Sequence, residues 1–253
     1  MVKLFNVKIS IITCVLNNSN LIKKSIKSFQ TQIYKNKEHI IIDGGSKDGT
    51  LDVIKKFKDR NLILSSSSDK GIYHALNKGI NLSSGGIIGI LHSDDFYKDN
   101  KVLKTIAKTF KQTNADLIYG DLVYVDKQYP FKVLRYWRAG KYLKKKLFNG
   151  WMPPHPTVFI KRSVFKRIGK YKTNYQISSD YDFLVRVLRK KNIKKIYIPK
   201  ILVNMRIGGV SNNSIKNLFR KSIEDFKIIK ANKIGGFLTL LNKNFSKIGQ
   251  FLN

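Results

Sequence analysis

The chain has 253 residues, of which 42% are hydrophobic and 11% aromatic, enough for one large globular domain or two small ones. Lys and Arg number 49 against 16 Asp and Glu, and the formal net charge of +33 favours an anionic partner: nucleic acid, an anionic membrane surface or a phosphorylated substrate. Cys14 is the only cysteine, which excludes an intramolecular disulfide and a thiolate cluster for structural zinc.

The N-terminus has no apolar run of signal-peptide length before the polar residues Asn6 and Lys8. No stretch of the sequence reaches the length that is needed to cross a bilayer. We therefore expect a cytoplasmic protein, and peripheral binding to the inner face of the plasma membrane stays open because the chain is so basic.

Strands and helices alternate over the first third of the chain. Runs rich in Ile and Val predict strands at residues 7–15, 38–43, 61–65 and 87–91. Apolar residues at helical spacing predict helices between them, at residues 21–33, 50–57 and 72–82. Because strands joined by helices form parallel sheets with right-handed crossovers, ligands should bind beyond the carboxyl ends of these strands.

Polar residues follow each of these strands at that edge. They are residues 13–17, Asp43, Asp69 and the pair Asp94 and Asp95. Two adjacent carboxylates at the end of a buried strand are costly unless a cation pairs with them, which favours a cation site. Turn formation and helix capping explain the same residues without a ligand, because Asp and Asn are favoured in turns and at helix starts.

The common nucleotide-binding motifs are not found in the sequence. No Gly-rich fingerprint follows the first predicted strand, and no Gly-Lys-Ser/Thr stands in a P-loop setting. The sequence therefore argues against a dinucleotide-dependent dehydrogenase and against a P-loop phosphotransferase.

The second half of the chain predicts a change in strand direction. Residues 115–125 form a further strand, and residues 131–137 are its expected antiparallel partner, so the sheet should be mixed. The proline-rich residues 151–157 predict an irregular loop that contains His155. Further strands are expected at residues 158–160, 193–198 and 202–206, with a break at Pro199.

Two amphipathic helical patterns end the chain, one from Ser214 onward and one over residues 237–252. They predict a C-terminal helical extension, residues 212–253, after a first domain of residues 1–211. Lys243 and Lys247 lie beside the second apolar face, which is typical of interfacial membrane helices. Packing on the domain or on a partner subunit explains that face equally, and the choice stays open.

Four blocks together resemble family 2 glycosyltransferases of the polysaccharide-biosynthesis type. They are Thr13 with Asn17, residues 41–50 (IIDGGSKDGT), residues 69–79 (DKGIYHALNKG) and residues 91–95 (LHSDD), in the order and spacing of that family. The resemblance covers roughly residues 5–210. It implies the GT-A fold, an α/β architecture with a mixed sheet flanked by helices, and inverting transfer from a nucleotide-sugar donor, a UDP-sugar above all.

The same resemblance implies roles for individual residues. Asp43 would hold the base, Asp94 the ribose, and Asp95 a metal ion, Mn²⁺ or Mg²⁺, since hard oxygen ligands suit both. His155 would contact phosphate and Arg206 the diphosphate. The donor-binding residues implied by the resemblance are Thr13, Asn17, Asp43, Asp69, Asp94, His155 and Arg206.

Residues 176–186 start a predicted helix with Ser178 or Ser179 as its cap. Asp180 and Asp182 fall in the first turn, where the helix dipole favours acids, so a purely structural role is one interpretation. The segment also resembles the Glu-Asp motif of the family, with Ser179 in place of the usual Glu. That resemblance implies Asp180 as the general base and Asp182 as a supporting carboxylate that pairs with Arg186 at helical spacing.

The resemblance implies a metal-dependent transferase of cell-envelope polysaccharide biosynthesis, whose acceptor is a hydroxyl group of a glycan or of a lipid-linked oligosaccharide. A basic nucleic-acid-binding protein is the alternative from another class, although only the net charge supports it. A sugar nucleotidyltransferase is a third candidate. It is disfavoured because no Gly-rich, arginine-bearing loop follows the first strand.

Overall fold

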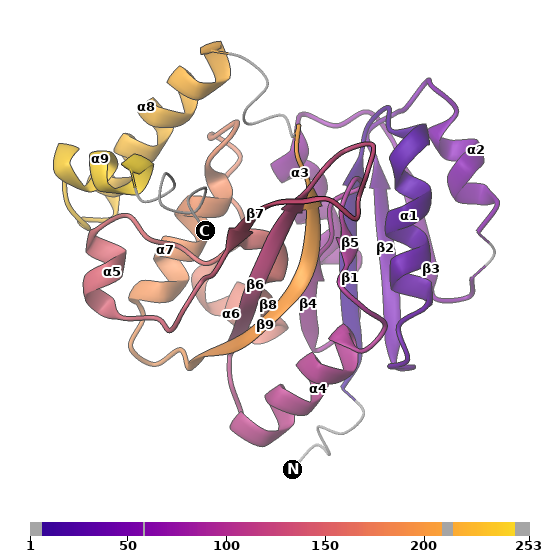
Figure 1. Ribbon diagram of the computed structural model, residues 1–253, viewed down its shortest axis with the longest axis horizontal. Helices are drawn as coiled ribbons and strands as arrows, with labels where there is room; N and C mark the ends of the chain where they lie inside the picture. The colour runs from indigo at the N-terminus through magenta and orange to yellow at the C-terminus, as the bar shows by residue number, and fades with distance from the viewer. Residues whose placement is uncertain (1–6, 58, 209–214, 246–253) are drawn as a thin grey trace.

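A computed structural model describes residues 7–57, 59–208 and 215–245 of the chain (Figure 1). Within these residues one sheet of nine strands forms the centre of the molecule, in the order β3-β2-β1-β4-β8-β6-β9-β5, with β7 paired to β6. The strands are β1 Ile9–Val15, β2 Lys37–Asp43, β3 Leu62–Ser66, β4 Ile87–Ile90, β5 Phe96–Tyr97, β6 Leu117–Val125, β7 Val133–Trp137, β8 Phe159–Lys161 and β9 Lys195–Arg206.

The sheet is mixed, as the sequence predicts. Strands β3, β2, β1 and β4 run parallel, so the ends that carry polar residues lie at one edge. Strand β8 is antiparallel to both β4 and β6, while β7 is the antiparallel partner of β6. This arrangement confirms the mixed sheet of the α/β architecture expected from the sequence.

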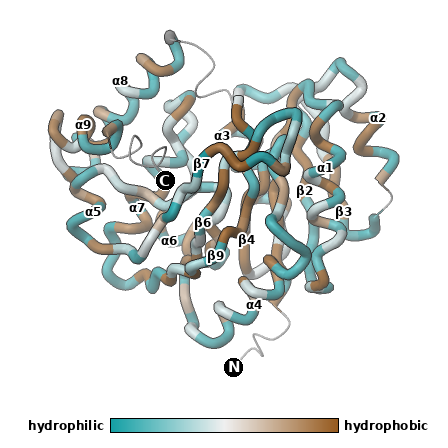
Figure 2. Tube along the Cα trace, in the orientation of Figure 1, coloured by the Kyte–Doolittle hydropathy of each residue, from teal (hydrophilic) through white to brown (hydrophobic). Residues whose placement is uncertain are grey.

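Helices cover both faces of the sheet. They are α1 Ser19–Gln30, α2 Thr50–Lys55, α3 Ile72–Leu82, α4 Val102–Thr113, α5 Lys144–Phe148, α6 Arg162–Ile168, α7 Ser179–Arg189, α8 Ile215–Ala231 and α9 Phe237–Phe245. Alternate residues of β1 serve opposite faces, because side chains of a strand alternate with a period of two. Ile9 and Ile11 pack in the cluster that contains α4, whereas Ile12 packs in the cluster that contains α3 and α7. Figure 2 shows the hydrophobic stretches gathered on the central strands.

Strand β9 differs from the expectation of two strands broken at Pro199. It is continuous from Lys195 to Arg206, and its pairing with β6 shifts register between Tyr119 and Asp121. Residues 198–200 of β9 therefore form a bulge opposite Gly120. A bulge accommodates the missing N–H of Pro199 without ending the strand.

The C-terminal helices pack on the rest of the molecule with one face. Ile228, Ile229 and Leu240 belong to the same buried cluster as α7. Helix α9 comes very close to the chain at Gly150, where an added Cβ would lie 2.5 Å from the Cβ of Lys243. Residue 211, the expected end of the first domain, lies outside the described residues.

The other face of α9 is open to solvent, where Phe237, Leu238 and Phe245 are 62–75% exposed. Packing on the domain therefore accounts for part of the amphipathic pattern and leaves an apolar strip on the surface. Within the described ranges, no helix is both long enough and apolar enough to cross a membrane.

Candidate active site

The ends of β1, β2 and β3 are joined by a polar network. The Asp43 carboxylate accepts hydrogen bonds from the main-chain N–H of Gly45 (3.0 Å) and Ser46 (3.1 Å) and from the Ser66 hydroxyl (2.7 Å). Burial alone would raise the pKa of Asp43, but the hydrogen bonds from Ser46, Ser66 and Gly45 outweigh it and lower the pKa. Asp43 is therefore an anion held in one orientation at this edge of the sheet.

Asn17 continues the network from the end of β1. Its backbone has φ +49°, the left-handed conformation that Asn tolerates better than most residues. The Asn17 side-chain oxygen accepts from the Lys47 N–H at 2.9 Å, and the Asn17 N–H donates to the Ser46 hydroxyl at 2.8 Å. These bonds fix the loop that contains Gly45 and Ser46 against the first strand.

Asp69 contributes a carboxylate to the same edge. One of its oxygens, Oδ2, is buried and unpaired within the described residues. Burial, with the nearby charge of Asp69, raises the pKa of the Cys14 thiol, so Cys14 is neutral. An unpaired buried carboxylate oxygen in a native protein is unusual, and a bound ligand is one way in which such an atom is satisfied.

Asp94 and Asp95 lie between β4 and β5, beside Arg206 at the end of β9. Asp95 is 1% exposed, and its Oδ1 accepts from the Arg206 main-chain N–H at 3.1 Å. Its Oδ2 is buried and has no partner among the residues that the structure describes. Burial, reinforced by the charge of Asp94, raises the pKa of Asp95 well above its usual value. Burial therefore disfavours the ionised form of Asp95 when no cation is bound.

The residues at this edge fit a divalent cation only together with ligand oxygens. In the part of the chain that the structure describes, no three His, Cys, Asp or Glu side chains come together as a metal site. The unpaired oxygen of Asp95 is a hard ligand of the type that Mg²⁺ and Mn²⁺ take. One or two carboxylates completed by phosphate oxygens and water are a common way to hold Mg²⁺, and Asp95 with Asp94 matches that donor set.

Two residues expected at the donor site have their side chains engaged inside the protein. The Thr13 hydroxyl donates to the Leu91 carbonyl at 2.7 Å and lies 2.8 Å from Nε2 of His39. The Arg206 guanidinium donates to the Asp94 carbonyl and lies over the Phe96 ring at 5.2 Å. Their side chains support the loop that carries Asp94 and Asp95, and neither lines the pocket described next.

A pocket of about 240 Å³ lies next to this edge, between α7, the loop before β8 and the C-terminal helices. Asp180 and His155 line it, as do the aromatic side chains Trp137 and Trp151. His92, two residues before Asp94, also lines the pocket, and its ring centroid lies 6.1 Å from that of His155. The pocket thus connects the end of β4 with the start of α7.

His155 is buried at the pocket wall, with Nε2 2.9 Å from the Tyr171 hydroxyl. Burial lowers the pKa of His155 to about 4, so the ring is neutral near pH 7. A neutral ring can exchange hydrogen bonds with a ligand, but it offers no positive charge to a phosphate.

Asp180 lies in the first turn of α7 and lines the pocket. Its Oδ1 is 3.3 Å from the Tyr73 hydroxyl, which donates its proton to the Ile177 carbonyl at 2.5 Å. The carboxylate is thus available to a bound molecule.

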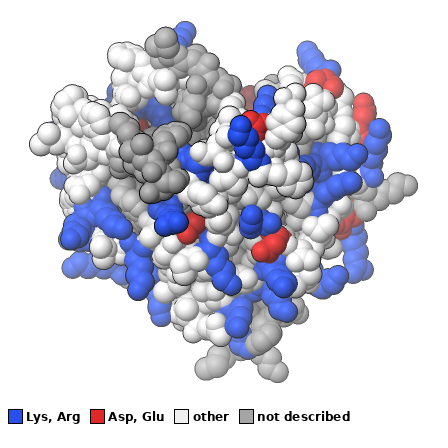
Figure 3. Space-filling model, in the orientation of Figure 1, with Lys and Arg blue, Asp and Glu red and all other residues white. Residues whose placement is uncertain are grey.

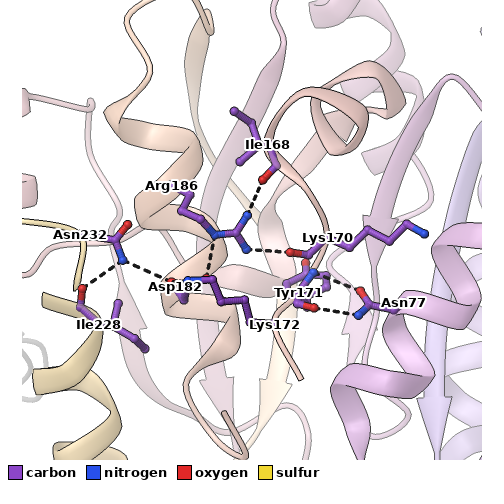
Figure 4. A network of polar contacts seen from close by, with 9 residues as sticks. All are labelled: Asn77, Ile168, Lys170, Tyr171, Lys172, Asp182, Arg186, Ile228 and Asn232. Carbon is purple, nitrogen blue, oxygen red and sulfur yellow. Dashed lines mark hydrogen bonds and ion pairs between the residues drawn. The ribbon is translucent and has the colours of Figure 1, made fainter. Parts of the chain in front are cut away.

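Asp182, by contrast, faces the interior of the protein and anchors α7 (Figure 4). Its carboxylate pairs with Nε of Arg186 at 2.8 Å and with Nζ of Lys172 at 3.2 Å, and Arg186 also donates to the carbonyls of Ile168 and Lys170 at 2.7 Å. The predicted pairing of Asp182 with Arg186 at helical spacing is confirmed.

The structure adds pocket residues that the sequence did not suggest. Lys221, Asp225 and Lys243 come from α8 and α9 and line the pocket together with Asp180. Lys243 pairs with Asp225, and its ammonium lies 3.8 Å from the centroid of the Tyr181 ring. An apolar helix pattern interrupted by a lysine on its buried side is the one signal in the sequence that could have indicated this contact.

Figure 3 shows Lys and Arg side chains in several groups on this face, between uncharged side chains and with few acids. Positive charge distributed over a surface raises the local concentration of anionic ligands. The acidic residues at the sheet edge and in the pocket therefore stand out in a protein in which basic residues far outnumber acidic ones.

Comparison with known proteins agrees with this geometry. The family model described as glycosyl transferase family 2 matches residues 10–169. A PGL/p-HBAD biosynthesis glycosyltransferase of Mycobacterium bovis (strain BCG / Pasteur 1173P2) is 27% identical over 219 residues, which are 85% of this chain and 83% of the relative. An uncharacterized glycosyltransferase of Rickettsia typhi is 28% identical over 244 residues, or 93% and 73% of the two chains.

Solved structures share the fold. Residues 1–349 of the S. aureus protein TarS in complex with UDP-GlcNAc have a TM-score of 0.69 at 16% identity, covering 89% of this chain and 65% of that chain. A mannosyltransferase from Pyrobaculum calidifontis in complex with GDP-Man and Mn²⁺ has a TM-score of 0.64 at 15% identity, covering 95% and 74%. These likenesses confirm the GT-A fold. Since the family model spans more than half of the sequence, the chain belongs to glycosyltransferase family 2.

Proposed function

We propose that the protein transfers a sugar, with inversion, from a nucleotide-sugar donor to a hydroxyl group of a glycan or of a lipid-linked acceptor. Family membership favours this reaction over nucleic-acid binding and nucleotidyl transfer. The observation that carries the proposal is the proximity of two sites: His92, which lines the pocket that contains Asp180, is two residues before Asp94 of the acidic edge. Inversion needs a base on the face of the sugar opposite the leaving group, and Asp180 is the candidate.

On the donor side, we assign each residue a role from the hydrogen bonds that its side chain can still form with a nucleotide sugar. Asp43 would accept from the base, with its orientation fixed by Gly45, Ser46 and Ser66. Asp69 has an unpaired buried oxygen among the described residues, which could accept a hydrogen bond from a ribose hydroxyl or from an N–H of the base. Asp94 would serve the ribose, and Asn17 would hold the loop against the donor. We propose a UDP-sugar, because TarS, which has the same fold, binds UDP-GlcNAc.

On the acceptor side, Asp180 would remove the proton from the attacking hydroxyl. The acceptor oxygen then bonds to the anomeric carbon while the bond from that carbon to the diphosphate oxygen breaks, and the nucleoside diphosphate leaves with the electron pair. Neutral His155 would orient a hydroxyl or phosphate oxygen by hydrogen bonding. A divalent cation at Asp95 would neutralise charge on the departing diphosphate.

The experiment is a screen of UDP-, GDP- and dTDP-sugars for binding and for transfer to glycan and lipid-linked acceptors, with and without Mn²⁺ or Mg²⁺. Saturable binding of one nucleotide sugar, with transfer that Asp180→Asn lowers by about 10²- to 10⁴-fold, supports the proposal. Binding without transfer to any hydroxyl acceptor, or transfer that is insensitive to Asp180→Asn, contradicts the assignment of the base.

We also propose that the protein works at the inner face of the plasma membrane, in cell-envelope polysaccharide biosynthesis. Phe237 and Leu238 of α9 and Phe219 of α8 are at least 60% exposed, and Lys216 and Arg220 stand on the same part of the surface as Phe219. Exposed apolar side chains next to basic ones are typical of a surface that binds anionic lipid. A lipid-linked acceptor would be presented at such a surface.

A further inference from the structure

The chain contains only two glutamates among its 16 acidic residues, and both are buried. Glu38 accepts hydrogen bonds at the start of β4, at the opposite end of the strand from Asp94. Glu224 lies on α8 and is 8% exposed. In a chain this rich in lysine, a buried carboxylate needs specific partners, since burying an unpaired charge is costly.

Glu224 has three such partners, all of them main-chain N–H groups. Its Oε1 accepts from Gln176 at 2.8 Å, and its Oε2 accepts from Ile177 and Ser178 at 2.9 Å each. These residues are consecutive and immediately precede α7. Hydrogen bonds from N–H groups to a carboxylate are charge-assisted and stronger than those between neutral groups.

Glu224 supplies one contact at the start of α7, because one of its three bonds comes from the N–H of the cap residue, Ser178. Ser178 occupies the cap position, yet its side chain makes no capping bond, and the buried hydroxyls of Ser178 and Ser179 have no partner in the part of the chain that the structure describes. A helix start leaves N–H groups unsatisfied and carries partial positive charge, so an anion next to it is favourable. Here that anion comes from another helix, 46 residues later in the sequence.

The residues held by Glu224 are also part of the pocket. Ile177 and Ser178 line it together with Asp180. The Ile177 carbonyl also accepts a hydrogen bond from the Tyr73 hydroxyl. The next residue of α8, Asp225, lines the pocket as well. One turn of α8 thus contacts both the segment before Asp180 and the space in front of it.

We propose that Glu224 is a positioning residue, which fixes the main chain of residues 176–178 and thereby the place of the Asp180 carboxylate in the pocket. The inference rests on the proposed function, in which Asp180 is the base. It assigns part of the catalytic apparatus to α8, beyond the matched residues 10–169 of the family model. A displacement of about 1 Å in a reacting group is enough to cost on the order of 10²-fold in rate.

The test is a double-mutant cycle between Glu224 and Asp180 on the full chain. Transfer rate, donor affinity and melting temperature are measured for the wild type, Glu224→Gln, Asp180→Asn and the double variant. Glu224→Asp is measured as well, so that the conclusion does not depend on one substitution. It keeps the negative charge but shortens the side chain by one methylene, which moves the carboxylate away from the N–H groups of residues 176–178. Glu38→Gln is the matched control, because it removes a second buried carboxylate that accepts main-chain N–H groups away from the pocket.

We expect Glu224→Gln to lower kcat about 10- to 100-fold with donor affinity within about twofold. In the Asp180→Asn background the same substitution should lower transfer by less than about twofold, since the base that it positions is already gone. Glu38→Gln should reduce the melting temperature but leave kcat near that of the wild type below the transition.

Equal fold losses from Glu224→Gln in both backgrounds would show a general structural effect and overturn the inference. So would a loss of kcat in Glu38→Gln as large as that in Glu224→Gln at a similar melting temperature. The failure of the proposed function has a different signature, because Asp180→Asn alone would then transfer sugar at the wild-type rate.

Discussion

Lys243 of α9 and Asp225 of α8 form an ion pair in which the side chains are only 6% and 1% exposed. The pair closes the pocket on the side of the C-terminal helices and lies against Tyr181, the residue after Asp180. Burial lowers the pKa of Lys243, while the charge of Asp225 opposes that shift. The C-terminal helices are therefore bound to the catalytic half of the molecule by charge as well as by apolar packing.

Removing one member of this pair should destabilise the protein more than removing both. Lys243→Met leaves Asp225 buried without a counter-charge, and the expected loss in free energy of unfolding is about 3–5 kcal/mol. Lys243→Met combined with Asp225→Leu removes both charges and should recover most of that loss. Chemical denaturation of the three proteins checks the prediction, and a double variant less stable than Lys243→Met would contradict it.

The sequence alone predicts the alternating first half, the convergence of Asp43, Asp69 and Asp94 on one edge, and the pairing of Asp182 with Arg186. These features depend on periodicity and on short spacings, which are local. Ser178, one of the two serines expected as the cap, is the cap residue of α7, but its side chain makes no capping bond. The bond from the Ser178 N–H to Glu224 joins residues 46 positions apart, so the sequence does not reveal it. The sequence does not reveal the place of Lys243 in the pocket either, because that place depends on how α9 packs near Gly150.

Asp95→Asn should stabilise the ligand-free protein at neutral pH. The pKa of Asp95 is raised in the folded state, so its ionisation opposes folding: the cost is absent below the unfolded pKa of about 4 and grows as the pH rises toward the folded value. Asparagine is neutral and keeps an oxygen for the Arg206 N–H. The melting temperature of Asp95→Asn should exceed that of the wild type at pH 7 to 8, and the difference should shrink at pH 4.

The same variant separates the proposed metal role from a structural one. Mn²⁺ together with a nucleoside diphosphate should raise the melting temperature of the wild type and have little effect on Asp95→Asn. Equal shifts in both proteins would exclude Asp95 as the principal ligand.

Acid should destabilise the protein in part through Glu38. Burial alone would raise the pKa of Glu38, but the bonds from Lys8, Ser10 and Ser84 outweigh it and lower the pKa to about 2. The stabilisation is complete above the unfolded pKa of about 4.3 and is lost as the pH falls through the folded pKa. Glu38→Gln should be less stable at pH 7, and its unfolding free energy should fall less between pH 5 and pH 2.

The apolar strip on α9 should matter for lipid binding and not for catalysis. Phe237→Glu with Leu238→Glu changes two exposed side chains, so folding and donor affinity should be unaffected. Binding to vesicles that contain phosphatidylserine should weaken by tenfold or more, because apolar insertion is lost and acids oppose the anionic surface. Thr239→Ala, on the buried side of the same helix, is the control for helix damage. Wild-type co-sedimentation of the double variant would exclude this strip as the membrane contact.

Asp180 is the residue for which two roles make opposite predictions. As a base that acts on the acceptor, Asp180 is not needed for donor binding, so Asp180→Asn should keep nucleotide-sugar affinity within several-fold while transfer falls by about 10²- to 10⁴-fold. As an acid in the first turn of α7, it would contribute only about 1 kcal/mol to stability, and Asp180→Asn would leave turnover nearly unchanged. Glu224 already supplies the anion at this helix start, so we expect the cost in melting temperature to be small.

Donor affinity, melting temperature and transfer rate measured on one preparation distinguish the two roles. Wild-type transfer with a lowered melting temperature would assign Asp180 to the helix and leave the base to be found among the other groups of the pocket, with neutral His155 as the first alternative.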